Sequence, residues 1–146
     1  MRIDQIVENR QTLFHGTSVK NAFNILRSGK IQPRTEQVID GKKIAGVSTS
    51  RSKRFALDWG HIIFEFSADA LRHHNKIVPV DFLQHSPHYK VDRRHCSEEF
   101  ILGELNDLAK CLDTIHIKST VRQTDYYDDI LDIIDDHYRH VKVVEL

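Results

Sequence analysis

The apolar residues of this chain occur in many short runs separated by glycine, serine and aspartate, and this pattern restricts the fold more than any other feature. Short apolar runs between turn residues are typical of β-strands, whereas apolar residues three or four apart indicate helices. Strands are predicted at residues 12–15, 46–49, 61–66, 76–80, 99–102, 112–117 and 141–146, and helices at 2–9, 19–26, 53–59, 126–138 and after residue 67. Irregular alternation of strands and helices over 146 residues predicts a single α+β domain, residues 1–146.

Local capping and turn residues support several of these boundaries. Ser18 precedes the helical pattern at 19–26 and Gly29 follows it, as expected of an N-cap and a left-handed C-cap. The polar stretch 32–43 contains the turn pair Asp40-Gly41. We predict a loop or a hairpin for that stretch.

The charge balance and the cysteine content exclude several classes of protein. Twenty-one Lys and Arg offset 21 Asp and Glu, so no net charge attracts the whole chain to nucleic acid or anionic lipid. No apolar run reaches the roughly 18–20 residues that cross a membrane, and the first residues lack the apolar core of a signal peptide. Cys96 and Cys111 are too few for a disulfide scaffold. We expect a cytoplasmic protein with no membrane partner.

A histidine–glycine pair ends the first predicted strand, in the run Leu-Phe-His-Gly-Thr-Ser of residues 13–18. Because Gly16 has no side chain, a flat polar ligand beside the His15 ring can reach the main-chain N–H and C=O groups. A strand that simply ends at His15 and turns at Gly16 explains the same residues. This motif alone leaves both interpretations open.

Small hydroxyl side chains occupy alternate positions near the second predicted strand. Ser48 and Ser50 share one face, and Thr49 points to the other. Two small hydroxyls leave room for a ligand and can orient it by hydrogen bonds. The alternative is a turn in which Ser50 or Ser52 caps the following helix.

Two carboxylates, Glu98 and Glu99, begin a later apolar strand, although glutamate is depleted in strands and costly to bury. Strand alternation sends them to opposite faces, so they cannot act as an acid/base pair on one bond. We expect one to face solvent and the other to point into a site. A strand start with both carboxylates in water is the alternative.

Taken in order, the three motifs resemble the ADP-ribosyltransferase superfamily. Residues 14–17 (Phe-His-Gly-Thr), followed by Ile-Leu-x-x-Gly at 25–29, are similar to the first strand and helix of the diphtheria-toxin-like, poly-ADP-ribose-polymerase branch. Residues 48–50 (Ser-Thr-Ser) are similar to a strand motif of the cholera-toxin-like branch. Glu99, in Glu-Phe-Ile-Leu, resembles the glutamate that both branches share. The resemblance covers roughly residues 12–118.

The resemblance implies a split two-sheet α+β core with flanking helices, and NAD bound in the cleft between the sheets. It implies a small mono-ADP-ribosyltransferase of bacterial or phage type. The enzyme would break the bond between nicotinamide and ribose of NAD, release nicotinamide and pass ADP-ribose to a macromolecular acceptor. We expect a protein acceptor more than a nucleic acid, and no metal.

The same resemblance assigns the catalytic role to Glu99 and a supporting role to His15. Glu99 would accept a hydrogen bond from a ribose hydroxyl and stabilise the oxocarbenium-like cation, because a fixed carboxylate there is worth more in the transition state than in the ground state. His15 would donate to a hydroxyl near the adenosine-side ribose. Glu98 stays an alternative to Glu99, since one residue of misregister exchanges the two faces.

Binding of NAD is assigned to His15, Gly16, Thr17, Ser48, Ser50 and Phe55. Gly16 would hold the nicotinamide carboxamide with its main chain, and Ser48 would steady the nicotinamide ribose or position Glu99. Phe55 would close over the nicotinamide ring or belong to a helix core. Arg51 or Arg54 would meet the pyrophosphate or belong to a solvated helix face.

Two departures from the family pattern keep other functions open. Phe55 and Trp59 stand where the first branch usually has tyrosines, and Ser97 stands where the second branch has Glu or Gln, two residues before its catalytic glutamate. An RNA 2′-phosphotransferase of the same superfamily is one alternative. A non-catalytic binding or inhibitory module with this fold is another.

Two further clusters, one of histidines and one of aspartates, do not have the spacing of metal sites. The histidines around residues 73–95 and Cys96 lack the second short-spaced pair typical of zinc sites. The aspartates of the helix at 126–138 lack the glycine turn of a calcium loop. The locally basic segment 81–97 is a candidate for acceptor recognition, or a solvated loop.

Overall fold

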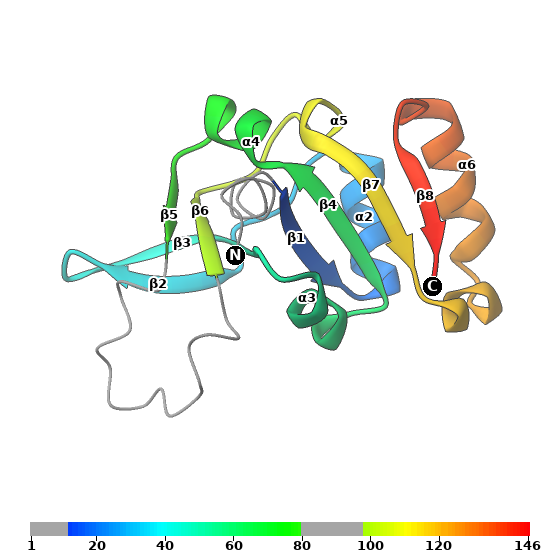
Figure 1. Cartoon of the computed structure of the whole chain (residues 1–146), viewed down its shortest axis with the longest axis horizontal. Coiled ribbons are helices and arrows are strands. Elements are labelled where there is room, and N and C mark those ends of the chain that lie inside the picture. Colours follow the sequence, from blue (N-terminus) through cyan, green and yellow to red (C-terminus); the bar gives the residue numbers. More distant parts are fainter. Residues whose placement is uncertain (1–11, 80–97) are drawn as a thin grey trace, which may run out of the picture.

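The computed structural model describes residues 12–79 and 98–146. Within these residues eight strands form one hydrogen-bonded sheet in the order β5-β6-β3-β1-β4-β7-β8, with β2 paired to β3 (Figure 1). The strands are β1 (Thr12–Thr17), β2 (Thr35–Ile39), β3 (Lys42–Ser50), β4 (Ile62–Ser67), β5 (Ile77–Pro79), β6 (Glu98–Leu102), β7 (Leu112–Ile117) and β8 (Lys142–Glu145). The helices are α2 (Val19–Ser28), α3 (Lys53–Trp59), α4 (Ala68–His74), α5 (Leu108–Cys111), the 3-10 helix η3 (Ser119–Gln123) and α6 (Tyr127–His137).

The α+β class predicted from the sequence is confirmed. The expected split into two sheets corresponds to a weak junction within one sheet. Strands β1 and β4 pair along their whole length, from Thr12↔Ser67 to Thr17↔Ile62. Strands β1 and β3 share the single register pair Phe14↔Ser50. One half, β2-β3-β6-β5, therefore joins the other, β1-β4-β7-β8, through a narrow junction. Figure 1 shows β2 and β3 running across the direction of β1, β4 and β7.

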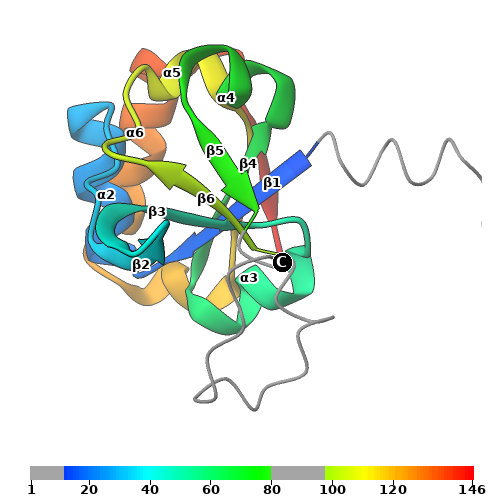
Figure 2. The ribbon, with the colours of Figure 1, turned by 90° about the vertical axis from the view of Figure 1, so that its left-hand side faces the viewer.

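The main hydrophobic core lies between the sheet and helices α2 and α6. Leu13, Phe64 and Ile115 come from the sheet, Ile25 from α2 and Ile134 from α6, and all are buried in one cluster. Figure 2 shows α2 beside α6 on one side of the sheet. Helix α3 lies on the opposite side, in front of the sheet in Figure 1. Burial of aliphatic and aromatic side chains of this kind contributes roughly 1.5–3 kcal/mol per residue.

Local sequence signals explain most boundaries. The Ser18 side chain accepts a hydrogen bond from the Asn21 N–H and Gly29 adopts a left-handed conformation, which confirms both caps of α2. Asp40 and Gly41 both have positive φ, which favours a two-residue hairpin turn, and the stretch 32–43 contains the β2–β3 hairpin. Pairing with β2 makes β3 longer than the predicted strand 46–49.

Some sequence predictions fall differently. Helix α5 and η3 were not expected, because single-turn helices carry too little periodicity to be recognised. The helix predicted at 2–9 and the basic segment 81–97, with His85, His88, His95 and Cys96, lie outside the described residues. Among residues 12–79 and 98–146, no group of three or more His, Cys, Asp or Glu side chains is placed to hold a metal ion. In the same part of the chain, no helix combines the length and apolarity needed to cross a bilayer.

Candidate active site

Strands β1 and β3 diverge beyond their single register pair, and a cavity of about 230 Å³ opens there. Its walls include residues from the end of β1, the middle of β3, the polar side of α2 and the loop before β2. Four of the predicted ligand-binding residues line this one cavity: His15, Gly16, Thr17 and Ser48. The first two motifs therefore meet, although 33 positions separate His15 from Ser48 in the sequence.

The His15 ring is fixed by a hydrogen bond between Nδ1 and the main-chain oxygen of Ser48, at 2.7 Å. A carbonyl oxygen only accepts, so Nδ1 carries the proton. Burial lowers the pKa of His15 below its usual 6.5, and the hydrogen bond to Ser48 offsets this only in part. The neutral ring then presents Nε2 as an acceptor. His15 is thus set up to accept a hydrogen bond from a ligand hydroxyl, which corrects the expectation that it donates one.

Acidification is expected to weaken the fold through His15. Because its pKa is lower in the folded than in the unfolded chain, the unfolded chain binds the extra proton as the pH falls below about 6.5, and the free energy of unfolding decreases. The asparagine of His15→Asn keeps an N–H donor near the position of Nδ1 without the titration. Chemical denaturation at several pH values should give a smaller loss of stability below pH 6.5 for this variant than for the wild type. Parallel pH profiles would contradict the assignment.

Gly16 is enclosed by helix α3. A Cβ atom at this position would lie 2.2 Å from the main-chain oxygen of Ala56, so only glycine allows α3 to pack this closely on β1. A Cβ atom at Gly60, just after α3, would likewise lie 2.3 Å from main-chain atoms of Thr17. Glycine at positions 16 and 60 therefore lets α3 pack on the end of β1, the segment that also lines the cavity.

Ser48 holds Glu98, not Glu99. The Ser48 hydroxyl donates to Oε1 of Glu98 at 2.5 Å. The reason is the register of β3 and β6, in which Ser50 pairs with Glu98 and Thr49 with Glu99. Directly opposite residues of antiparallel strands share a face, so Glu98 lies on the serine face. The expectation that Ser48 positions Glu99 is therefore wrong, while the opposite facing of the two carboxylates is confirmed.

Glu99 lies on the other face, where its side chain is 10 % exposed. It forms an ion pair with Arg51, whose Nε lies 3.9 Å from its Oε1. Thr49 also donates a hydrogen bond to the main-chain oxygen of Glu99. Neither Glu98 nor Glu99 is among the described residues that line the cavity, and Glu98 is the one bonded to a residue that does. Arg51, one of the two candidates for the pyrophosphate, thus interacts with a carboxylate instead.

Ser50 and Phe55 are also not among the described residues that line the cavity. The Ser50 hydroxyl accepts from the Ser52 N–H, and the Ser52 hydroxyl caps α3 by accepting from the Phe55 N–H. The capping interpretation of this segment is therefore confirmed for Ser52. Phe55 is half-buried, and its ring centroid lies 6.0 Å from that of Trp59.

Several cavity residues were missed by the sequence analysis. Lys30 and Arg34 supply positive charge, and Asn21 and Asn24 supply amide groups from α2. The asparagines occupy polar positions of an amphipathic helix, and this pattern is the only sequence signal that places them on the side of α2 away from the core. The two cations lie in a loop with no motif of its own.

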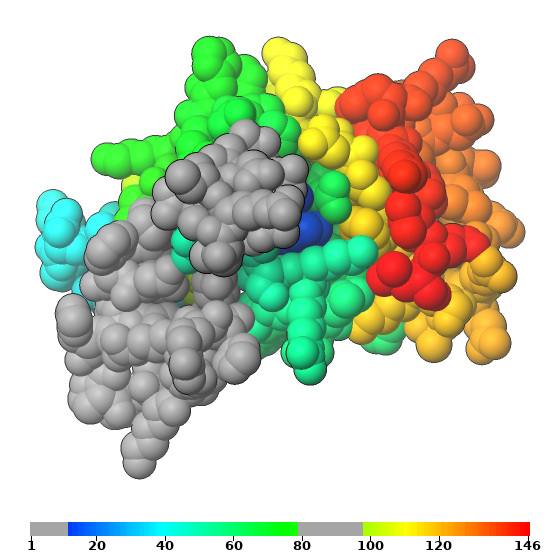
Figure 3. Space-filling view, in the orientation of Figure 1, coloured from blue at the N-terminus to red at the C-terminus, as the bar shows by residue number. Residues whose placement is uncertain are grey.

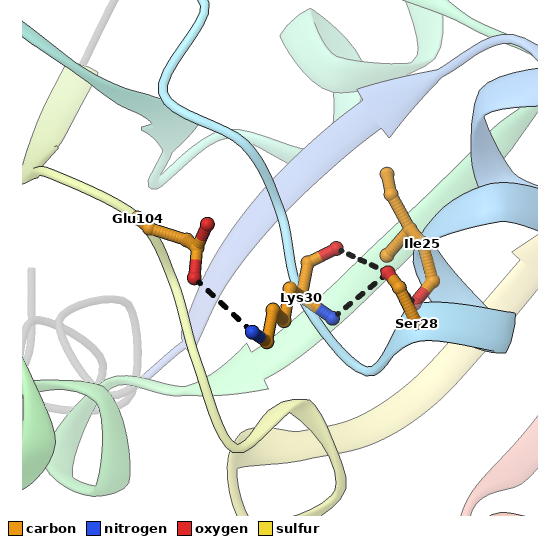
Figure 4. Close-up of polar contacts among 4 residues, drawn as sticks. All are labelled: Ile25, Ser28, Lys30 and Glu104. Atoms are coloured by element: carbon orange, nitrogen blue, oxygen red, sulfur yellow. Dashed lines mark hydrogen bonds and ion pairs between the residues drawn. The ribbon is translucent and has the colours of Figure 1, made fainter.

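Lys30 is held at the cavity by its main chain (Figure 4). The Ser28 hydroxyl donates to the Lys30 oxygen and accepts from the Lys30 N–H, both at 3.3 Å. The next residue, Ile31, exchanges two main-chain hydrogen bonds with Leu105. The Lys30 ammonium group lies 3.8 Å from Oε1 of Glu104 and is half exposed, so this ion pair is weak. The ammonium group can therefore turn toward an anion in the cavity at little cost.

Comparison with known proteins supports the fold. No protein-family model matches the sequence, and no curated protein matches it.

Three solved structures of DarT from Thermus sp. 2.9 are similar. The complex with NAD+ has a TM-score of 0.59 at 13 % identity, covering 94 % of this chain and 96 % of DarT. The complex with ADP-ribosylated ssDNA has a TM-score of 0.56 at 12 % identity, covering 94 % of each chain. The complex with carba-NAD+ has a TM-score of 0.54 at 13 % identity, covering 94 % and 95 %. The chain therefore has an ADP-ribosyltransferase-like α+β fold.

Proposed function

We propose that this chain is a NAD-dependent ADP-ribosyltransferase that passes ADP-ribose to a macromolecular acceptor and releases nicotinamide. The observation that carries the proposal is the convergence of the first two motifs at the β1–β3 cavity. The ring of His15, the main chain of Gly16 and Ser48 line it although their strands are distant in the sequence, and Ser48 donates a hydrogen bond to Glu98 of the third motif. The structural likeness to DarT complexes with NAD+ and carba-NAD+ supports NAD as the substrate.

Glu98 is the carboxylate that this geometry favours for catalysis. It is bonded to a serine that lines the cavity, whereas Glu99 lies on the opposite face. In the reaction the bond between the nicotinamide nitrogen and ribose C1′ breaks, and nicotinamide leaves with the electron pair. The Glu98 carboxylate stabilises the positive charge that develops on the ribose ring. The acceptor nucleophile then bonds to C1′ and loses its proton.

The remaining cavity residues bind the dinucleotide. Gly16 offers its main-chain groups to the nicotinamide carboxamide, and Nε2 of His15 accepts a hydrogen bond from a ribose hydroxyl. Lys30 and Arg34 replace Arg51 and Arg54 as the partners of the diphosphate, because they border the cavity. A charged donor on a phosphate oxygen makes a strong hydrogen bond, and Arg34 can do so bidentately.

A nucleic acid is the acceptor that we propose. The expectation of a protein acceptor has no support among the similar structures, one of which holds ADP-ribosylated ssDNA. A nucleic-acid acceptor also agrees with the locally positive character of the chain around α3, where Lys53 and Arg54 lie.

One assay tests both parts of the proposal. The purified chain is incubated with NAD labelled on the adenosine side, together with single-stranded DNA, single-stranded RNA or cell-extract protein, and nicotinamide is measured separately. We expect nicotinamide release and label on a nucleic acid. Labelled protein with unlabelled nucleic acid would contradict the acceptor. No nicotinamide release with any acceptor, together with no binding of ADP-ribose by calorimetry, would contradict the enzyme.

A further inference from the structure

We infer that the exposed side of helix α3 is the surface on which a single-stranded nucleic acid stacks, with Trp59 as the base-stacking residue. This inference rests on the proposed function, since it names the place where the acceptor is held. It is carried by the exposure of Trp59, by the packing of its helix on the cavity-lining end of β1 and by the positive charge of that helix.

Trp59 is unusually exposed for its type. Its exposed fraction is 70 %, the highest among the large hydrophobic side chains that the structure describes as exposed. An indole left in water forgoes the free energy that its burial would supply, so a base stacked on it would gain that free energy. Phe55 lies four residues earlier on the same helix side, with ring centroids 6.0 Å apart and planes 54° from parallel. Phe55 therefore supports the indole from within the protein, while most of its surface stays accessible.

Helix α3 packs on the part of β1 that lines the cavity. Gly16 and Thr17 line the cavity from one side. On their other side they touch α3 and the residue after it, because Ala56 closely approaches Gly16 and Gly60 closely approaches Thr17. Trp59 directly precedes Gly60. The space-filling view shows the α3 surface, in teal, open to solvent in front of the sheet (Figure 3). Because the end of β1 is what separates α3 from the cavity, a nucleic-acid strand stacked on Trp59 would have only this segment to pass to reach the site of transfer.

The charge of helix α3 suits a phosphate backbone, because its two cations outnumber its one carboxylate. Lys53 and Arg54 belong to α3 itself, and Asp58 is the single acidic residue of the helix. Arg54 is exposed and Lys53 is partly exposed. Single-stranded nucleic acids are bound by this combination, in which aromatic rings stack on bases and nearby cations follow the phosphates. A protein partner would use the aromatic pair but would gain nothing general from the cations.

Trp59 reports on its own contacts, because it is the only tryptophan of the chain. An unlabelled single-stranded DNA of mixed sequence and about 10 nucleotides, within the usual site size of such surfaces, is titrated into the protein without NAD. We expect saturable quenching of tryptophan fluorescence. Binding of the same DNA carrying fluorescein, followed by anisotropy, should weaken roughly 5- to 100-fold in Trp59→Ala. Trp59→Phe, which keeps an aromatic ring, should restore most of the affinity.

Two further variants sharpen the test. Arg54→Ala should weaken binding and reduce its dependence on salt concentration. Val38→Ala removes another exposed apolar side chain, on β2, and should leave DNA affinity unchanged. DNA binding that is absent in the wild type, or equal in Trp59→Ala and wild type, would overturn the inference. Nicotinamide release is scored separately, so an enzyme without Trp59-dependent DNA binding refutes only this inference. DNA binding with neither nicotinamide release nor ADP-ribose binding refutes only the proposed function.

Discussion

Glu98→Gln is expected to lower the rate of nicotinamide release from NAD by roughly 10²–10³-fold, the effect typical of losing one fixed electrostatic contact to a transition state. The glutamine side chain keeps the size of the glutamate and still accepts the Ser48 hydroxyl hydrogen bond. It lacks the negative charge that stabilises the oxocarbenium-like ribose. The rate at saturating NAD should therefore fall, while affinity for ADP-ribose should change little. Single-turnover release of nicotinamide, followed by chromatography, measures the effect.

Glu99→Gln is the matched control for this prediction. The Glu99 carboxylate lies on the opposite face near Arg51, so the substitution removes an ion pair away from the cavity and should act mainly on stability. If Glu99→Gln abolishes release and Glu98→Gln retains it, Glu99 is the catalytic carboxylate and the Ser48–Glu98 pair is structural. If both variants retain the wild-type rate, neither carboxylate is catalytic.

Gly16→Ala is expected to destabilise the fold by roughly 1–3 kcal/mol or more, the usual range for overpacking a closely packed site. The added methyl group would lie 2.2 Å from the main-chain oxygen of Ala56, and backbone cannot rotate away as a side chain can. Helix α3 must therefore shift off β1. A thermal melt should show a decrease of several degrees, since each 1 kcal/mol corresponds to roughly 2–4 °C in a chain of about this size.

Gly41→Ala separates this steric effect from the general cost of replacing glycine. A methyl group at position 41 would meet no atom within 4 Å, but the φ of 78° at this position is strained for alanine. Its cost should be about 1 kcal/mol and confined to the hairpin. Gly16→Ala should also reduce the affinity for NAD, whose nicotinamide Gly16 holds in the proposed function, whereas Gly41→Ala should not. Equal melting temperatures for Gly16→Ala and wild type would show that α3 is not packed on β1 as described.

The elements that the sequence predicted well are those with local chemical signals. The caps Ser18 and Gly29 bound α2, Ser52 starts α3, and β7 spans the predicted residues, Leu112–Ile117. Each of these features depends on residues a few positions apart, so pattern and structure agree.

The candidate site could be predicted only in part, because its remaining contacts are between distant segments. His15, Gly16 and Ser48 were identified from their residue types, and the structure brings them to one cavity. The register between β3 and β6 decides whether Ser48 contacts Glu98 or Glu99, and the contacting residues are 50 positions apart. A shift of one residue in this register would exchange the two glutamates. The placement of Lys30 depends on main-chain bonds between Ile31 and Leu105. No local pattern encodes either contact.

The single register pair between β1 and β3 has a consequence for how a ligand acts on the whole molecule. Few backbone hydrogen bonds fix the relative orientation of the two halves of the sheet at this point. A molecule that fills the cavity contacts both halves at once, and so adds contacts between them where the sheet itself supplies few. Its binding free energy therefore adds to the stability of the junction, and we expect the chain to melt at a higher temperature when the cavity is filled.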